Sequence, residues 1–212
     1  MRRLSWGLAA ATLGMALPLA ACASVPEQPT ALFLGDSYTA GAALPAQQLD
    51  DRWPTRLSQQ LGWTEMNEGC DGAGYTRPGV VCMTTYREHV DAVLDSDPDI
   101  IVVSGALNDL GSTLGEIEAA VHATFLTLRD AFPDAELYAV GGVYADAGDA
   151  TATLEEINAI VKAQVERVGG TFVDIGEPLL GRPDLLADDG VHPNSEGHAV
   201  IAELTSHVIG EG

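Results

Sequence analysis

Residues 99–104 read Asp99-Ile100-Ile101-Val102-Val103-Ser104, in which 100–103 form an apolar run with no polar residue inside it. A strand that faces water on one side alternates polar and apolar residues, so an unbroken run indicates a strand covered on both faces. We predict the other strands at 31–34, about 64–67, 136–141 and 171–175. Helix-length segments separate them, and we predict helices at about 54–61, 84–95, 113–131, 152–168 and 195–209.

The helical segments show a helical spacing of apolar residues. In 113–131, residues Leu114, Ile117, Val121, Phe125 and Leu128 recur close to every 3.6 positions, as expected for a helix with one buried side. Asn194 precedes the last segment and is a suitable N-cap. Strands that alternate with helices predict one α/β domain whose parallel sheet carries helices on both faces.

The first residues have the pattern of an export signal. Arg2 and Arg3 form a basic start, an apolar stretch runs from 4 to 21, and small residues precede Cys22. This pattern is typical of a secretory signal peptide, and the cysteine after it resembles a bacterial lipobox. We therefore expect a signal peptide at 1–21, a lipidated Cys22 opening a tether at 22–29, and a domain at 30–212. An ordinary signal peptide and an uncleaved anchor remain alternatives.

The charge and cysteine content narrow the partners. The chain has 10 Lys+Arg against 31 Asp+Glu, a formal charge of −21, which disfavours nucleic acid and anionic lipid as partners. We expect an extracytoplasmic monomer held at the bacterial cell envelope by its lipid anchor. In an exported protein, Cys70 and Cys82 form a plausible disulfide. No metal or cofactor motif is present, so we expect neither.

Polar motifs follow the predicted strands at their carboxyl ends. Ser37 follows the first strand, a glycine-rich segment at 69–74 the second, Asn108 and Asp109 the third, and His192 lies beyond the fifth. Ligands of a parallel α/β sheet bind beyond this edge. Four motifs in loops on one rim can therefore meet in space.

Three of these residue types make a nucleophilic triad. A serine hydroxyl is a weak nucleophile until an imidazole takes its proton, and an acid fixes the imidazole tautomer. Ser37 would be the nucleophile, His192 the base and Asp189 the group that orients it. Asp188 is an alternative orienting group, whereas Asp36 and Asp109 are expected to shape their loops.

Over about residues 30–209 the chain resembles the SGNH, or GDSL-type, hydrolase family. Its four blocks occur in order: Gly35-Asp36-Ser37, Asn67 with Gly72 five residues later, an element ending in Asn108-Asp109, and Asp189-Gly190-Val191-His192. Two positions depart from the family pattern, because Tyr38 replaces the common leucine and Ala106 stands where a glycine is usual.

The resemblance implies a three-layer α/β/α, flavodoxin-like fold with a five-stranded parallel sheet. It also implies an oxyanion hole made by the backbone N–H groups of Ser37 and Gly72 and the side-chain amide of Asn108. We expect a serine esterase that cleaves carboxylic esters through an acyl-enzyme on Ser37. Short acyl groups such as acetyl are favoured, with an O-acetylated envelope carbohydrate as one candidate substrate. An acyltransferase with the same triad and a non-catalytic binding lipoprotein are the alternatives. Tyr75 is expected in the core or at the substrate rim.

Overall fold

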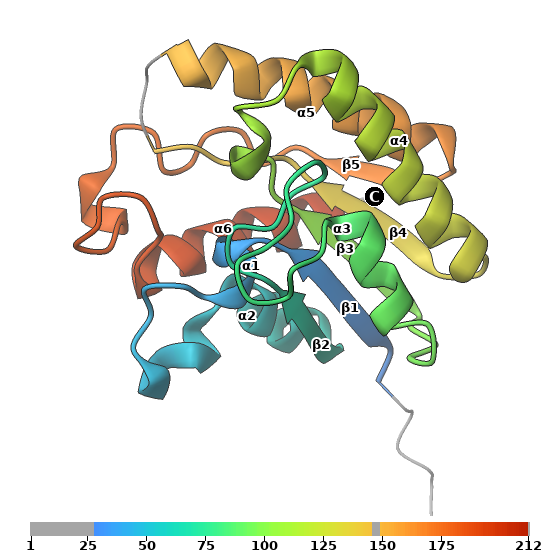
Figure 1. The fold of residues 1–212 in the computed structure, drawn as a ribbon. Helices are drawn as coiled ribbons and strands as arrows, with labels where there is room; N and C mark the ends of the chain where they lie inside the picture. The colour runs from blue at the N-terminus through green and yellow to red at the C-terminus, as the bar shows by residue number, and fades with distance from the viewer. Residues whose placement is uncertain (1–27, 146–148, 212) are drawn as a thin grey trace, which may run out of the picture.

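The computed structural model of the chain describes residues 28–145 and 149–211, so the predicted leader and Cys22 lie outside the described residues. Five strands form one fully parallel sheet in the order β2-β1-β3-β4-β5 (Figure 1). The strands are β1 (Thr30–Gly35), β2 (Thr64–Gly69), β3 (Ile100–Ser104), β4 (Glu136–Val140) and β5 (Thr171–Val173). The predicted five-stranded parallel sheet is confirmed.

Helices cover both faces of this sheet, which confirms the three-layer α/β/α fold. One face carries α2 (Trp53–Leu61) and α6 (Ser195–Gly210). The other carries α3 (Tyr86–His89), α4 (Leu114–Ala131) and α5 (Asp149–Arg167). Alternate residues of β1 explain the two cores: Leu32 packs among residues of α4 and α5, and Phe33 packs edge-on against Trp53 of α2 at 5.5 Å.

Two helical segments differ from the sequence expectation. The predicted helix at 84–95 is the short α3, which Thr85 and Glu88 cap reciprocally, followed by the 3₁₀ turn η2 (Val90–Ala92). A four-residue helix that the pattern did not predict, α1 (Ser37–Ala40), follows β1. It is too short to show periodicity, and Gly41 ends it in the left-handed region at φ 81°. The other 3₁₀ turns are η1 (Ala46–Asp51), η3 (Leu107–Asp109) and η4 (Pro183–Leu185).

The strand register brings the loops of β1, β2 and β3 to one level. Gly35 pairs with Gly69 on one side and with Ser104 on the other. A Cβ on Gly69 would lie 2.3 Å from the backbone nitrogen of Ala40, the last residue of α1. Glycine at this strand end therefore lets the short helix α1 lie directly against β2.

Candidate active site

Ser37 is the first residue of α1, in the turn that follows β1. The preceding Asp36 caps this helix, because its Oδ1 accepts a hydrogen bond from the backbone nitrogen of Tyr38 at 2.9 Å. Asp36 is 2% exposed, and burial raises the pKa of its carboxyl group to about 7. The structure therefore gives Asp36 the loop-shaping contact that the sequence predicted for it.

His192 and Asp189 lie in one loop before α6, and they complete a hydrogen-bonded chain with Ser37. His192 Nε2 lies 3.0 Å from Ser37 Oγ, and His192 Nδ1 lies 2.6 Å from Asp189 Oδ2. The other carboxylate oxygen of Asp189 accepts the backbone N–H groups of Val191 and His192 at 2.9 and 3.0 Å. Asp188 is exposed and is not the partner of the ring, so Asp189 is the group that orients it.

The charge of the Asp189 carboxylate determines which ring nitrogen of His192 carries the proton. The hydrogen bond from His192, together with the two backbone N–H groups, holds the pKa of the Asp189 carboxyl at about 2. Asp189 is therefore ionised at neutral pH and accepts the Nδ1 proton of the neutral ring. That tautomer leaves the Nε2 lone pair facing the Ser37 hydroxyl, which is the arrangement that general-base activation of a serine requires.

Three further hydrogen-bond donors are those predicted for the oxyanion hole. Among the described residues, the backbone N–H groups of Ser37 and Gly72 have no hydrogen-bond acceptor. Asn108 follows β3, and its Nδ2 donates to the carbonyl oxygen of Ala73 at 2.8 Å. An amide nitrogen carries two hydrogens, so a second donor position of Asn108 stays available.

Asp109 ties the loop after β2 to the loop after β3. Its buried carboxylate accepts hydrogen bonds from the backbone nitrogens of Tyr75 and Thr76 at 3.0 and 2.7 Å, and from Thr76 Oγ1 at 2.6 Å. A Cβ on Gly74 would come within 2.7 Å of this carboxylate. Asp109 therefore shapes its loop, as the sequence predicted, and it fixes Gly72 relative to Asn108 through the same loop.

A disulfide bond between Cys70 and Cys82 closes the loop that contains Gly72. Gly79 lies against both sulfur atoms, because a Cβ there would approach them within 2.3 and 2.5 Å. Val80, next along the loop, donates its backbone N–H to the carbonyl oxygen of Asp71 at 2.8 Å. The covalent bond and this hydrogen bond together restrict the segment on either side of Gly72.

The structure also accounts for the departure at Ala106. Ala106 is buried and has an extended backbone at φ 174°, which any residue adopts. The preceding Gly105 has φ 124°, and a Cβ on it would lie 2.3 Å from Tyr86 Oη and 2.7 Å from Asp36 Oδ2. Glycine is therefore needed one position earlier than in the family pattern, and Asn108 keeps its place.

Two aromatic residues of the site region behave differently from the sequence expectation. Tyr75 is 2% exposed and packs edge-on against Tyr86 at 5.0 Å, so its placement at the substrate rim was wrong and its placement in the core was right. Tyr38, which stands in place of the leucine common in the family, contacts the histidine loop through its hydroxyl. The signal available in the sequence was a hydroxylated aromatic residue directly after the nucleophile.

Among residues 28–145 and 149–211 no group of three or more His, Cys, Asp or Glu side chains is placed to hold a metal ion. No helix within the same ranges combines the length and the apolar character needed to cross a bilayer.

An α/β sheet with a Ser–His–Asp chain at the carboxyl ends of its strands is the arrangement found in serine hydrolases. The model of the GDSL-like Lipase/Acylhydrolase family matches residues 33–200. The chain therefore belongs to that family, and the predicted family is confirmed. The family places it among the esterases and acylhydrolases.

Known proteins agree with this assignment. The chain is 28% identical over 189 residues to the GDSL lipase Rv0518 of Mycobacterium tuberculosis, covering 83% of this chain and 79% of the relative. Its fold is similar to that of Est24, a carbohydrate acetylesterase from Sinorhizobium meliloti (TM-score 0.66, 15% identity, 87% and 98% coverage). It is also similar to that of Axe2, an acetylxylan esterase from Geobacillus stearothermophilus (TM-score 0.63, 21% identity, 86% and 94% coverage).

Proposed function

We propose that the protein is a serine esterase that hydrolyses carboxylic esters of short acyl groups through an acyl-enzyme on Ser37. The observation that carries this proposal is the unbroken hydrogen-bonded chain from Ser37 Oγ through His192 to the Asp189 carboxylate. Residues 155 positions apart in the sequence meet in this chain, and a hydroxyl bonded to an oriented imidazole is an activated nucleophile.

In the acylation step, His192 Nε2 takes the hydroxyl proton while Ser37 Oγ attacks the ester carbonyl carbon. The negative charge that develops on the carbonyl oxygen is stabilised by the N–H groups of Ser37 and Gly72 and by the Asn108 amide. Collapse of the tetrahedral intermediate breaks the bond to the leaving alcohol, which receives the proton from His192. Asp189 stabilises the imidazolium while it carries that proton.

In the deacylation step, water takes the place of the alcohol. His192 Nε2 accepts a proton from the water, the hydroxide attacks the acyl carbon, and Ser37 leaves with the proton returned by His192. The products are the free carboxylic acid and the original enzyme. A chain that passed the acyl group to a sugar hydroxyl instead would be an acyltransferase built on the same residues.

The proposed preference for short acyl groups draws on proteins of similar fold. Two structures with this fold are named as an acetylxylan esterase and a carbohydrate acetylesterase, and we propose an O-acetylated carbohydrate as the substrate class.

The proposed location is outside the cytoplasm, with the domain attached to the envelope through lipid on Cys22. Support comes from the leader sequence and from the Cys70–Cys82 bond, because disulfides persist in oxidising compartments. Mass spectrometry of Cys22-containing peptides from the membrane fraction tests this proposal. A mature protein that carries no lipid mass on Cys22 would contradict it.

The catalytic proposal is tested with the purified protein and activated esters of acetate, butyrate and octanoate. We expect turnover that declines with acyl length, and stoichiometric labelling by a fluorophosphonate that intact-protein mass spectrometry detects. Both should vanish in Ser37→Ala and in His192→Ala. Ser206→Ala, a serine of α6, is the matched control and should behave as the wild type.

Wild-type turnover in Ser37→Ala would refute the serine mechanism. Folded wild-type protein that neither reacts with the fluorophosphonate nor hydrolyses any ester would instead favour a binding protein. A further reaction with an added acceptor alcohol separates an esterase from an acyltransferase, because acyl transfer should exceed hydrolysis only in an acyltransferase.

A further inference from the structure

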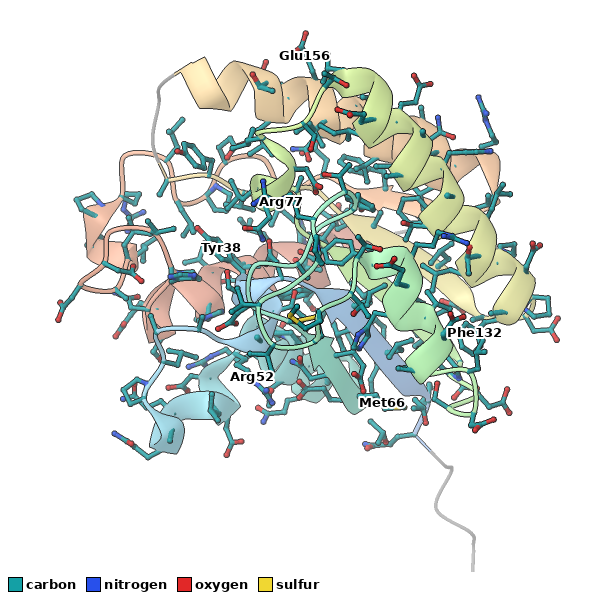
Figure 2. The ribbon with its side chains drawn as sticks, viewed as in Figure 1. Tyr38, Arg52, Met66, Arg77, Phe132 and Glu156 are labelled. Atoms are coloured by element: carbon teal, nitrogen blue, oxygen red, sulfur yellow. A yellow bond between two sulfur atoms is a disulfide. The ribbon has the colours of Figure 1, made fainter. Side chains whose placement is uncertain are left out.

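The residue after the nucleophile reaches across to the loop that carries the catalytic base. Tyr38 is 7% exposed, and its hydroxyl donates a hydrogen bond to the backbone carbonyl oxygen of Val191 at 2.5 Å. Its ring lies 5.8 Å from the His192 ring at an angle of 57°. Figure 2 labels Tyr38 between the first strand and the red segment that leads to α6. Burial raises the pKa of the Tyr38 phenol, so the hydroxyl stays protonated and donates.

Most hydrogen bonds that the structure gives residues 188–192 lie within their own loop. Asp189 accepts the backbone N–H groups of Val191 and His192, and the backbone N–H of Ala187 donates to the carbonyl oxygen of His192 at 2.8 Å. Gly190 likewise donates to the carbonyl oxygen of Ala187 at 2.9 Å. These bonds fix His192 relative to Asp189, but they do not fix either residue relative to Ser37.

Two hydrogen bonds connect this loop to the short helix that carries Ser37. Within the part of the chain that the structure describes, residues 188–192 are linked to elements outside their own loop by His192–Ser37 and Tyr38–Val191 alone. The first is the reacting contact itself, which must break and reform in each catalytic cycle. The second can persist throughout, because neither Tyr38 Oη nor Val191 O takes part in the chemistry.

We propose that Tyr38 is a positioning residue, whose hydroxyl holds the histidine loop at the distance from which His192 can deprotonate Ser37. This inference rests on the proposed function. A leucine at this position would fill the core beneath the loop, but it has no donor for the Val191 carbonyl. Small errors in the distance between base and nucleophile have large effects on rate. The hydroxyl should therefore affect kcat far more than KM.

The test compares Tyr38→Phe with Tyr138→Phe. Tyr138 of β4 donates its hydroxyl to Glu136 Oε2 at 2.9 Å, so the control also loses one phenolic hydrogen bond. For Tyr38→Phe we expect a fall of about tenfold in kcat, which corresponds to about 1.4 kcal/mol in the barrier. The rate of fluorophosphonate labelling should fall by the same factor. The KM and the midpoint of the pH dependence of kcat/KM should stay at the wild-type values.

Two results would overturn the proposal: an unchanged kcat, whether or not KM rises, or a shift of the pH midpoint. The last would mean that the hydroxyl acts on the charge of the pair and not on its position. Rates are expressed per fluorophosphonate-titrated site, so that a loss of folded protein does not imitate a loss of kcat. Ser37→Ala is measured alongside: activity that survives there refutes the proposed function, whereas an inactive Ser37→Ala beside a fully active Tyr38→Phe refutes only the role of Tyr38.

Discussion

Replacing Asp109 by asparagine tests whether one buried carboxylate organises the loop after β2, which contains Gly72. The carboxylate accepts three hydrogen bonds, one on Oδ2 from Tyr75 and two on Oδ1 from Thr76. An asparagine has one oxygen and one NH₂ group. If its oxygen faces Thr76, the NH₂ group meets the backbone N–H of Tyr75, and two donors oppose each other in a site with no exposure.

The expected loss of stability follows from the number of hydrogen bonds that the replacement affects. A hydrogen bond to a charged group contributes about 1.5–3 kcal/mol, and a buried donor left unpaired costs about 1–3 kcal/mol. We therefore expect Asp109→Asn to lower the free energy of unfolding by about 3 kcal/mol. For a domain of this size that corresponds to a fall in Tm of roughly 6–12 °C. Complete removal of one oxyanion donor costs about 10²–10³ in rate, so displacing Gly72 relative to Asn108 should lower kcat at least tenfold.

Denaturant titration gives the free energy, and kcat is measured well below the Tm of the variant on titrated sites. Asp134→Asn is the matched control, because Asp134 is exposed in the turn before β4. The reasoning is refuted if Asp109→Asn unfolds at the same denaturant concentration as Asp134→Asn. It is also refuted if stability falls as expected while kcat per folded site stays at the wild-type value.

Three further perturbations test other parts of the site and its support. Replacing both Cys70 and Cys82 by serine should lower stability by about 3 kcal/mol, the loop-entropy value for a ring of this size, and should lower kcat because Gly72 lies inside the ring; calorimetry and ester turnover measure the two effects. Asp189→Asn should reduce kcat by about 10⁴-fold, as loss of the orienting acid does in other triads, with an unchanged circular dichroism spectrum because Asp189 is exposed. Burial, together with the charge of Arg56, lowers the pKa of His198 to about 4. The unfolded chain therefore binds this proton more tightly than the folded chain does, so the contribution of neutral His198 to the free energy of unfolding is present above about pH 6.5 and is lost as the pH falls. Between about pH 7.5 and pH 5 the free energy of unfolding of the wild type should fall by about 2 kcal/mol more than that of His198→Asn. Asparagine is chosen because its side chain can still accept the backbone N–H of Trp53, which His198 Nδ1 accepts at 3.3 Å. Equal falls for the two proteins in denaturant titrations would contradict this.

The fold was predictable because its signals are local and redundant. The run at 100–103 is buried along its whole length, as the absence of alternation indicated, and Asn194 caps α6 by accepting the Gly197 N–H at 3.0 Å. By contrast, the short helix α1 exists because Asp36 caps it and β2 supports it. Four residues carry no periodicity, so only tertiary contacts could reveal it.

In the candidate site, too, some features follow from residues close in sequence and others depend on contacts between distant elements. Asp189 and His192 are three residues apart, so one turn suffices to bring them together, but the sequence left the neighbouring Asp188 as an alternative that only the structure removed. The depth of Tyr75 could not be predicted, because the aromatic neighbours that bury it, Tyr86 and Phe125, come from α3 and α4. An aromatic residue in a glycine-rich loop suits a rim and a core equally until those helices are placed.

The contacts around Tyr38 join these local and non-local parts. The pair Asp189–His192 assembles within its own loop, and Ser37 is set by β1 and the Asp36 cap, so each half can form without the other. Catalysis needs the two halves at one hydrogen-bond distance across 155 positions of sequence. A hydroxyl that is adjacent to the nucleophile in sequence and bonded to the histidine loop in space is the direct means of setting that distance. Because Tyr38→Phe leaves the ring in the core and the Asp36 cap in place, this change should separate activity from stability, whereas loss of Asp109 should reduce both.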